Sequence, residues 1–192
     1  MQIQTYVIDN FYNNVDEVRE YALNQEFQTI GNFPGQRTAN FLNDDVRKTI
    51  QTIIQPEAGD ITHWETQYNG CFQMTTSWDR SWIHCDATTG WAGVLYLTPN
   101  APLSAGTAIY KHKETGLMSW KYSEHTDEEN KTAAPLLETQ DFTKWELVDR
   151  FANVYNRLIL YRGEYFHTSL DYFGTNKENA RLFQTFFFNT EY

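Results

Sequence analysis

His84 and Asp86 flank Cys85, and a second histidine, His167, follows much later in the chain. Two imidazoles and one carboxylate can occupy one face of an Fe(II) octahedron and leave three positions open for ligands that react. Alternate residues of a strand share a face, so His84 and Asp86 would point the same way and Cys85 the other way. These residue types predict an open metal site.

A place for an anion lies beside this predicted site. Iron held by two neutral imidazoles and one carboxylate keeps a positive charge, which favours an anionic co-substrate. Arg181 follows His167 in the sequence, and its planar guanidinium can make two parallel hydrogen bonds to a carboxylate. The combination indicates an oxygenase more strongly than His-x-Asp alone, because that triplet is found by chance in many chains.

The N-terminal third predicts elements that support the site rather than form it. Residues 3–8 read as a strand, and residues 13–25 carry apolar side chains at helical spacing, with a cap near Asn14 or Asp16. Residues 44–55 predict a second helix with one apolar side, and the Pro-Gly of residues 33–38 predicts a turn.

The rest of the chain predicts strands. Aromatic or branched residues alternate with polar ones, or run together between Gly, Pro and Asn, in five segments: 62–78, 90–99, 106–113, 156–163 and 180–189. Helices followed by strands indicate an α+β fold, mainly β, with a sandwich or barrel core. We expect one domain over residues 1–192, with helical support over 1–60 and the β core over 61–192.

Residues 114–149 interrupt this pattern. Their first part is highly charged and residues 136–150 read as weakly helical. A long insertion in a small domain is often a lid or a binding loop. A solvated excursion between two strands is an equal alternative.

Composition limits the class of partner. The 192 residues have a net charge of −10, which argues against binding to a phosphate backbone, and the 16% aromatic content fits a packed core.

No signal-like leader or run of eighteen apolar residues is present. Cys71 and Cys85 are the only cysteines, and a disulfide between them would distort the predicted metal triplet around Cys85. We therefore expect a cytoplasmic protein in a reducing compartment, with no nucleic-acid partner and no membrane; the oligomeric state is open.

The order of the segments resembles the Fe(II)- and 2-oxoglutarate-dependent dioxygenases, in particular the prolyl-4-hydroxylase-like branch. The resemblance covers about residues 61–190 and rests on five elements in the family's order: His84-Cys85-Asp86, Tyr96-Leu97-Thr98, Ala105-Gly106-Thr107, His167 and Arg181. It implies a double-stranded β-helix, a jelly-roll or cupin-like core, with the N-terminal helices packed outside.

The same resemblance implies a role for each matched residue. His84, Asp86 and His167 would bind iron. Arg181, Tyr96, Thr185 and, less directly, Gln73 would hold 2-oxoglutarate. Oxygen would be the second co-substrate, ascorbate a supporting reductant, and succinate and CO2 the co-products of C–H hydroxylation. Asp86 favours hydroxylation, because halogenating relatives have a small residue at that position.

The substrate is not readable from the chain. A peptidyl residue, a free amino acid and a small metabolite are all compatible with the resemblance. Arg37 and Arg80 could meet an acidic substrate, whereas the acidic insertion could meet a basic one, and Trp78, Trp82 and Trp91 could line a pocket or pack in the core. Two other classes stay open: a non-catalytic cupin-like metal-binding or structural protein, and a hydrolase with Zn(II) in the same triad.

Overall fold

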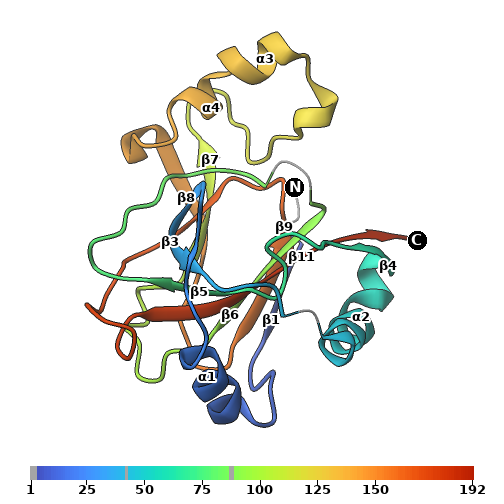
Figure 1. The fold of residues 1–192 in the computed structure, drawn as a ribbon. Helices are drawn as coiled ribbons and strands as arrows, with labels where there is room; N and C mark the ends of the chain where they lie inside the picture. Colours follow the sequence, from blue (N-terminus) through green and yellow to red (C-terminus); the bar gives the residue numbers. More distant parts are fainter. Residues whose placement is uncertain (1–3, 42, 87–88) are drawn as a thin grey trace.

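Two antiparallel sheets make up most of the structure, a computed structural model that describes residues 4–41, 43–86 and 89–192 (Figure 1). The larger sheet has eight strands in the order β1-β9-β6-β11-β5-β3-β2, with β4 also paired to β11, and the smaller has the order β10-β7-β8. The strands are β1 (Thr5–Ile8), β2 (Thr29–Gly31), β3 (Phe33–Arg37), β4 (Asp60–Trp64), β5 (Phe72–Thr75), β6 (Trp91–Tyr96), β7 (Thr107–His112), β8 (Trp145–Phe151), β9 (Leu158–Arg162), β10 (His167–Ser169) and β11 (Arg181–Glu191). A mainly β architecture is confirmed.

Strand β11 is the axis of the larger sheet. One edge pairs with β6 along Phe183–Phe188, while the other pairs with β5 near Arg181 and with β4 near Glu191. Side chains alternate between the two faces of a strand. Phe183 therefore packs toward the smaller sheet with Ile109 of β7, whereas Leu182 and Phe186 pack on the opposite face. The two faces of the larger sheet carry separate clusters.

Two helices cover the face that lies away from the smaller sheet. They are α1 (Val15–Leu23) and α2 (Asp44–Ala58), as Figure 1 shows. The Asn43 side chain caps α2 by accepting hydrogen bonds from two backbone N–H groups of the first turn. Ile50 and Ile54 recur at helical spacing and are fully buried against the sheet. Among the described residues, no helix has the length and apolar character needed to cross a bilayer.

The predicted turn at residues 33–38 is wrong, because residues 33–37 form β3. Gly35 has a φ of 72°, and a Cβ at this position would collide with the carbonyl oxygen of Met74. Glycine thus lets a Pro-Gly segment run close beside β5 and pair with it. The consequence is that Arg37 lies on a strand, paired with Gln73, rather than on a mobile turn.

The weakly helical prediction for residues 136–150 is also wrong in its second half. Residues 145–151 form β8, which pairs with β7 along its length and buries Trp145 and Phe151. Pairing and burial override the local propensity here. Before β8 the insertion forms α3 (Asp127–Thr132) and α4 (Ala134–Leu137), which Figure 1 shows at the end of the molecule opposite α1.

The N-terminal segment contributes more than helices. Strands β1, β2 and β3 all belong to the eight-stranded sheet, and β1 pairs with β9. Of the strand expected over residues 3–8, Thr5–Ile8 is found, and Ile3 lies outside the described residues. The first 60 residues therefore complete the sheet as well as cover it.

Replacement of a core isoleucine tests the role of the α2 face. Ile54→Ala should lower the free energy of unfolding by about 2–5 kcal/mol, because Ile54 is fully buried. Ile30→Ala is the matched control, since Ile30 is 75% exposed, and should change stability by less than about 0.5 kcal/mol. Urea denaturation measures both; equal losses would contradict this account of the core.

Candidate metal centre

A single pair of backbone hydrogen bonds brings the two distant histidines together. The His84 N–H donates to the His167 carbonyl at 2.9 Å, and the His167 N–H donates to the His84 carbonyl at 2.8 Å. In an antiparallel pair, directly opposed residues project their side chains from the same face. The imidazole centroids accordingly lie 4.4 Å apart. The segment around His84 thus extends the smaller sheet beyond β10.

Asp86 completes the group from the same short segment. Its N–H donates to the Gly163 carbonyl at 2.7 Å, which ties the segment to the end of β9. Asp86 Oδ2 lies 3.6 Å from His167 Nε2, and one ligand atom from each of the three residues lies within 4.8 Å of the others. Among the described residues, no other group of three histidine, cysteine or carboxylate side chains meets this geometry.

Both histidines are oriented by the carbonyl two residues before them. His84 Nδ1 lies 3.0 Å from the Trp82 carbonyl oxygen, and His167 Nδ1 lies 2.7 Å from that of Tyr165. A carbonyl can only accept, so each Nδ1 is the donor, and in the neutral form of either ring the lone pair is on Nε2. Such outer contacts fix the tautomer and ring orientation of metal-binding histidines. The two Nε2 atoms and an Asp86 oxygen can therefore hold a metal ion.

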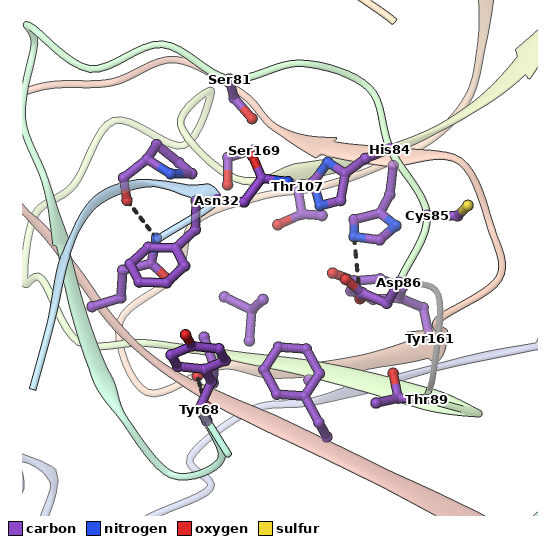
Figure 2. A pocket seen from close by; sticks show the side chains of 18 of the residues that line it. Asn32, Tyr68, Ser81, His84, Cys85, Asp86, Thr89, Thr107, Tyr161 and Ser169 are labelled. Atoms are coloured by element: carbon purple, nitrogen blue, oxygen red, sulfur yellow. Dashed lines mark hydrogen bonds and ion pairs between the residues drawn. The ribbon is translucent and has the colours of Figure 1, made fainter. Parts of the chain in front are cut away.

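Burial shifts the pKa values of two residues of this segment pair, His167 and Cys85. Desolvation, aided by the neighbouring His84, lowers the pKa of His167 to about 4, so its imidazole is neutral at pH 7. Desolvation and the Asp86 charge raise the pKa of the Cys85 thiol to about 12. Figure 2 shows the sulfur directed away from His84 and Asp86. Cys85 is a protonated packing residue, and both cysteines are free.

The three residues open onto a cavity of about 670 Å³. Figure 2 shows part of its wall, with Asn32 and Tyr68 across the space from His84. The insertion also reaches this cavity, since Tyr122, Leu136 and Thr139 belong to its lining. The volume is in the range of small-molecule sites.

Arg181 is fully buried at the start of β11. Its Nε and Nη2 donate to the carbonyls of Ala105 and Gly106 at 2.9 and 3.2 Å, while Nη1 has no partner among the described residues. The guanidinium lies 5.5 Å from the Tyr96 ring and 4.4 Å from the Phe183 ring. Arg181 and Tyr96 do not line the cavity itself, but both contact residues that do.

The other two predicted anion-site residues do line the cavity. Thr185 Oγ1 donates to the Tyr68 carbonyl at 3.0 Å. Gln73 is held at both ends: its Oε1 accepts from Arg37 Nε, and its Nε2 donates to the Pro34 carbonyl, each at 2.7 Å. Gln73 thus lies within the cavity wall with its amide already engaged.

Tyr161 is a cavity residue that the sequence did not predict, whereas Arg37, Arg80 and three tryptophans were candidates for substrate contact. Tyr161 is buried, with its ring edge-on to His167 at 4.7 Å, and alternation with Ile159 along β9 is the signal that places it on the inner face. Arg37 lines the cavity, whereas Arg80 is exposed and bonds to nearby carbonyls. Of the three tryptophans, Trp82 lines the cavity, Trp91 packs in the helix-facing core and Trp78 is exposed.

The remaining histidines are engaged elsewhere. His63 contacts Glu65 at 2.8 Å, His112 contacts Glu138 at 2.7 Å, and His125 stacks on Trp120. None of the three belongs to the metal-binding group.

The buried His167 makes the stability of the metal-free protein depend on pH. Its pKa is 6.5 without perturbation and about 4 in the fold, so the unfolded chain binds the proton first as pH falls. The free energy of unfolding therefore does not depend on His167 above pH 6.5, and it falls by about 3 kcal/mol as the pH drops from 6.5 to 4. Urea denaturation with EDTA should show a smaller loss over this range for His167→Gln than for the wild type. Parallel pH profiles would contradict the assignment.

Three solved structures are similar to this chain at low sequence identity. HygX from Streptomyces hygroscopicus, with nickel, 2-oxoglutarate and hygromycin B bound, has 9% identity and a TM-score of 0.60, covering 99% of this chain and 84% of its own. SnoN, a non-heme alpha-ketoglutarate-dependent epimerase from nogalamycin biosynthesis, has 13% identity and a TM-score of 0.60, covering 98% and 79%. A Pseudomonas putida prolyl-4-hydroxylase has 13% identity and a TM-score of 0.50, covering 100% and 95%.

These likenesses concern the fold, because identities near 10% do not carry activity from one protein to another. All three proteins share the β architecture described above. No curated protein sequence matches the chain. One sequence family does match, over residues 1–187. The chain belongs to this family, which is described as a family of unknown function (DUF6445).

Proposed function

We propose that the protein is an Fe(II)- and 2-oxoglutarate-dependent oxygenase that hydroxylates a C–H bond. The observation that carries the proposal is the triad itself: His84, Asp86 and His167 offer ligand atoms within 4.8 Å of one another at the wall of a large cavity. We further propose that the two sheets form a double-stranded β-helix and that the chain lies near the prolyl-4-hydroxylase-like branch. The likeness to the Pseudomonas putida enzyme supports this placement at fold level.

The donor set fits iron. Two imidazole nitrogens and one carboxylate oxygen leave open positions on an octahedral ion, unlike the closed four-coordinate sites of structural zinc. The hydrogen bonds from Nδ1 of both histidines hold the rings for this purpose before any metal binds. HygX binds nickel and 2-oxoglutarate within a similar fold.

The surroundings of Arg181 fit a carboxylate. A fully buried guanidinium with an unpartnered Nη1 is costly unless an acceptor is supplied. The distal carboxylate of 2-oxoglutarate would be that acceptor, with Tyr96 beside it. Thr185 and Gln73, which line the cavity, would complete this end of the site. Because Phe183 lies over Arg181, its side chain would have to give way as the cosubstrate enters.

The chain's own residues would position and enclose the reactants. Bound iron and 2-oxoglutarate would supply the oxidising power, with O2 consumed and succinate and CO2 released. Tyr161 and Phe183 present an apolar wall next to the triad, and Tyr122 and Leu136 of the insertion close another side. These residues would exclude water and hold a peptidyl residue, amino acid or small metabolite next to the metal.

Cosubstrate binding tests the proposal without a known substrate. Under anaerobic conditions, Fe(II) and 2-oxoglutarate should give the visible charge-transfer band of the chelate. Arg181→Met should weaken 2-oxoglutarate binding at least tenfold, because it removes a charged hydrogen-bond donor. Arg150→Met is the control, since Arg150 is exposed and its guanidinium bonds to no described residue except the Ser104 carbonyl. Absence of the band in the wild type would overturn the proposal.

Substitution of single triad residues tests whether they bind the metal. His84→Ala and Asp86→Ala should each reduce Fe(II) affinity by at least tenfold and abolish succinate release in the presence of Fe(II), ascorbate and 2-oxoglutarate. Unchanged behaviour of both variants would favour a non-catalytic role for the cavity. Turnover with Zn(II) alone, without 2-oxoglutarate, would favour a hydrolase.

A further inference from the structure

Arg37 presents an unused cationic group to the same cavity as the triad. It is 8% exposed at the end of β3, and among the described cavity-lining residues it is the only arginine or lysine. Its Nε donates to Gln73 Oε1 at 2.7 Å. Among the described residues, neither Nη1 nor Nη2 has a hydrogen-bond or ion-pair partner, and neither is a fully buried atom, so both nitrogens are open to the cavity.

Aromatic rings surround this guanidinium without satisfying it. Its central carbon lies 3.9 Å from the ring centroid of Phe33, 5.3 Å from that of Tyr68 and 5.9 Å from that of Phe187. Ring stacking engages the face of a guanidinium and leaves its N–H edges free for hydrogen bonds. A purely packing role therefore accounts for the rings but not for the two free nitrogens.

Neighbouring residues hold Arg37 in a fixed position. Gln73 is buried and bonded at its other end to the Pro34 carbonyl, so it holds Arg37 Nε in one place. Gly35 permits the close approach of β3 to β5 that pairs Arg37 with Gln73. With Nε engaged, the Nη1 and Nη2 pair remains as a fork that matches the two oxygens of a carboxylate.

The carboxylates on the cavity wall do not neutralise Arg37. Glu65 is engaged by His63 Nε2 at 2.8 Å, and Asp86 belongs to the triad. Desolvation of Arg37 costs free energy and lowers its pKa to about 10, an effect that the charge of Asp86 offsets only in part. An anion that enters the cavity would recover part of that cost.

We propose that Arg37 is a substrate-recognition residue and that the substrate carries a carboxylate attached to an apolar or aromatic group. The carboxylate would bind the Arg37 fork, and the apolar group would lie against the surrounding rings. The other end of the molecule would then reach toward the triad, since Arg37, Phe33, His84 and Asp86 line one cavity. This inference rests on the proposed function, because it names the substrate class of the same site.

Matched acids and amides test the proposal. N-acetyl derivatives of phenylalanine, leucine and proline, each as the free acid and as the carboxamide, would be titrated by calorimetry into protein saturated with Ni(II) and 2-oxoglutarate. At least one acid should bind ten times more tightly than its amide, which is the effect of one charged hydrogen-bonded contact. The preference should vanish in Arg37→Met, fall in Arg37→Lys and persist in Arg150→Met.

The result that no acid is preferred over its amide would overturn the proposal, as would a preference that survives in Arg37→Met. If Arg37→Met fails to fold, the acid-to-amide ratio of Arg37→Lys decides, since lysine keeps the charge but loses the fork. If Arg37→Met weakens the 2-oxoglutarate band as much as Arg181→Met, Arg37 belongs to the cosubstrate site and the proposal is wrong. Failure of the proposed function would be seen separately, as absence of the 2-oxoglutarate charge-transfer band from the wild-type protein. In that case the ratio of acid to amide affinity would be measured with Ni(II) and without 2-oxoglutarate.

Discussion

The reciprocal backbone hydrogen bonds between His84 and His167 are the contact on which the site depends. They join two segments more than eighty residues apart in sequence into adjacent positions of the smaller sheet. Their register decides which side chains share a face, and a shift of one residue would replace both histidines with neighbours that point away. The anchor of Asp86 on Gly163 then adds the carboxylate to the same side.

The two faces of the larger sheet have different roles, since one packs in the core under the helices and the other faces the cavity. Along β11, Leu182 and Phe186 pack against the helix-covered core, while Phe183 and Thr185 face the cavity. Similarly, Leu160 and Tyr161 are successive residues of β9 that belong to opposite faces. A protein can therefore vary the cavity-facing residues for a different ligand while the alternate residues preserve the core.

Local pattern predicted the two helices and six strand segments, the one near the N-terminus and the five after residue 61, because burial leaves a clear period in the sequence. The residue types and the family resemblance also predicted that His84, Asp86 and His167 form one group, and the structure brings their ligand atoms within 4.8 Å of one another; the role of Arg181 stays a prediction. The two wrong predictions of secondary structure have the same cause. Residues 33–37 and 145–151 form strands because β5 and β7 pair with them, and pairing between distant segments leaves no local signal. The place of Arg37 in the cavity follows from that missed pairing, and the closeness of Tyr161 to His167 is likewise a product of the fold.

The Tyr165 carbonyl sets the orientation of the His167 imidazole, and this orientation would affect how a metal ion binds. His167 is already neutral at pH 7, with its proton on Nδ1 and a lone pair on Nε2. A metal ion arriving at Nε2 has no proton to displace from this ring and no tautomer to convert. Binding of a metal ion at His167 would thus be independent of the proton concentration over the neutral range.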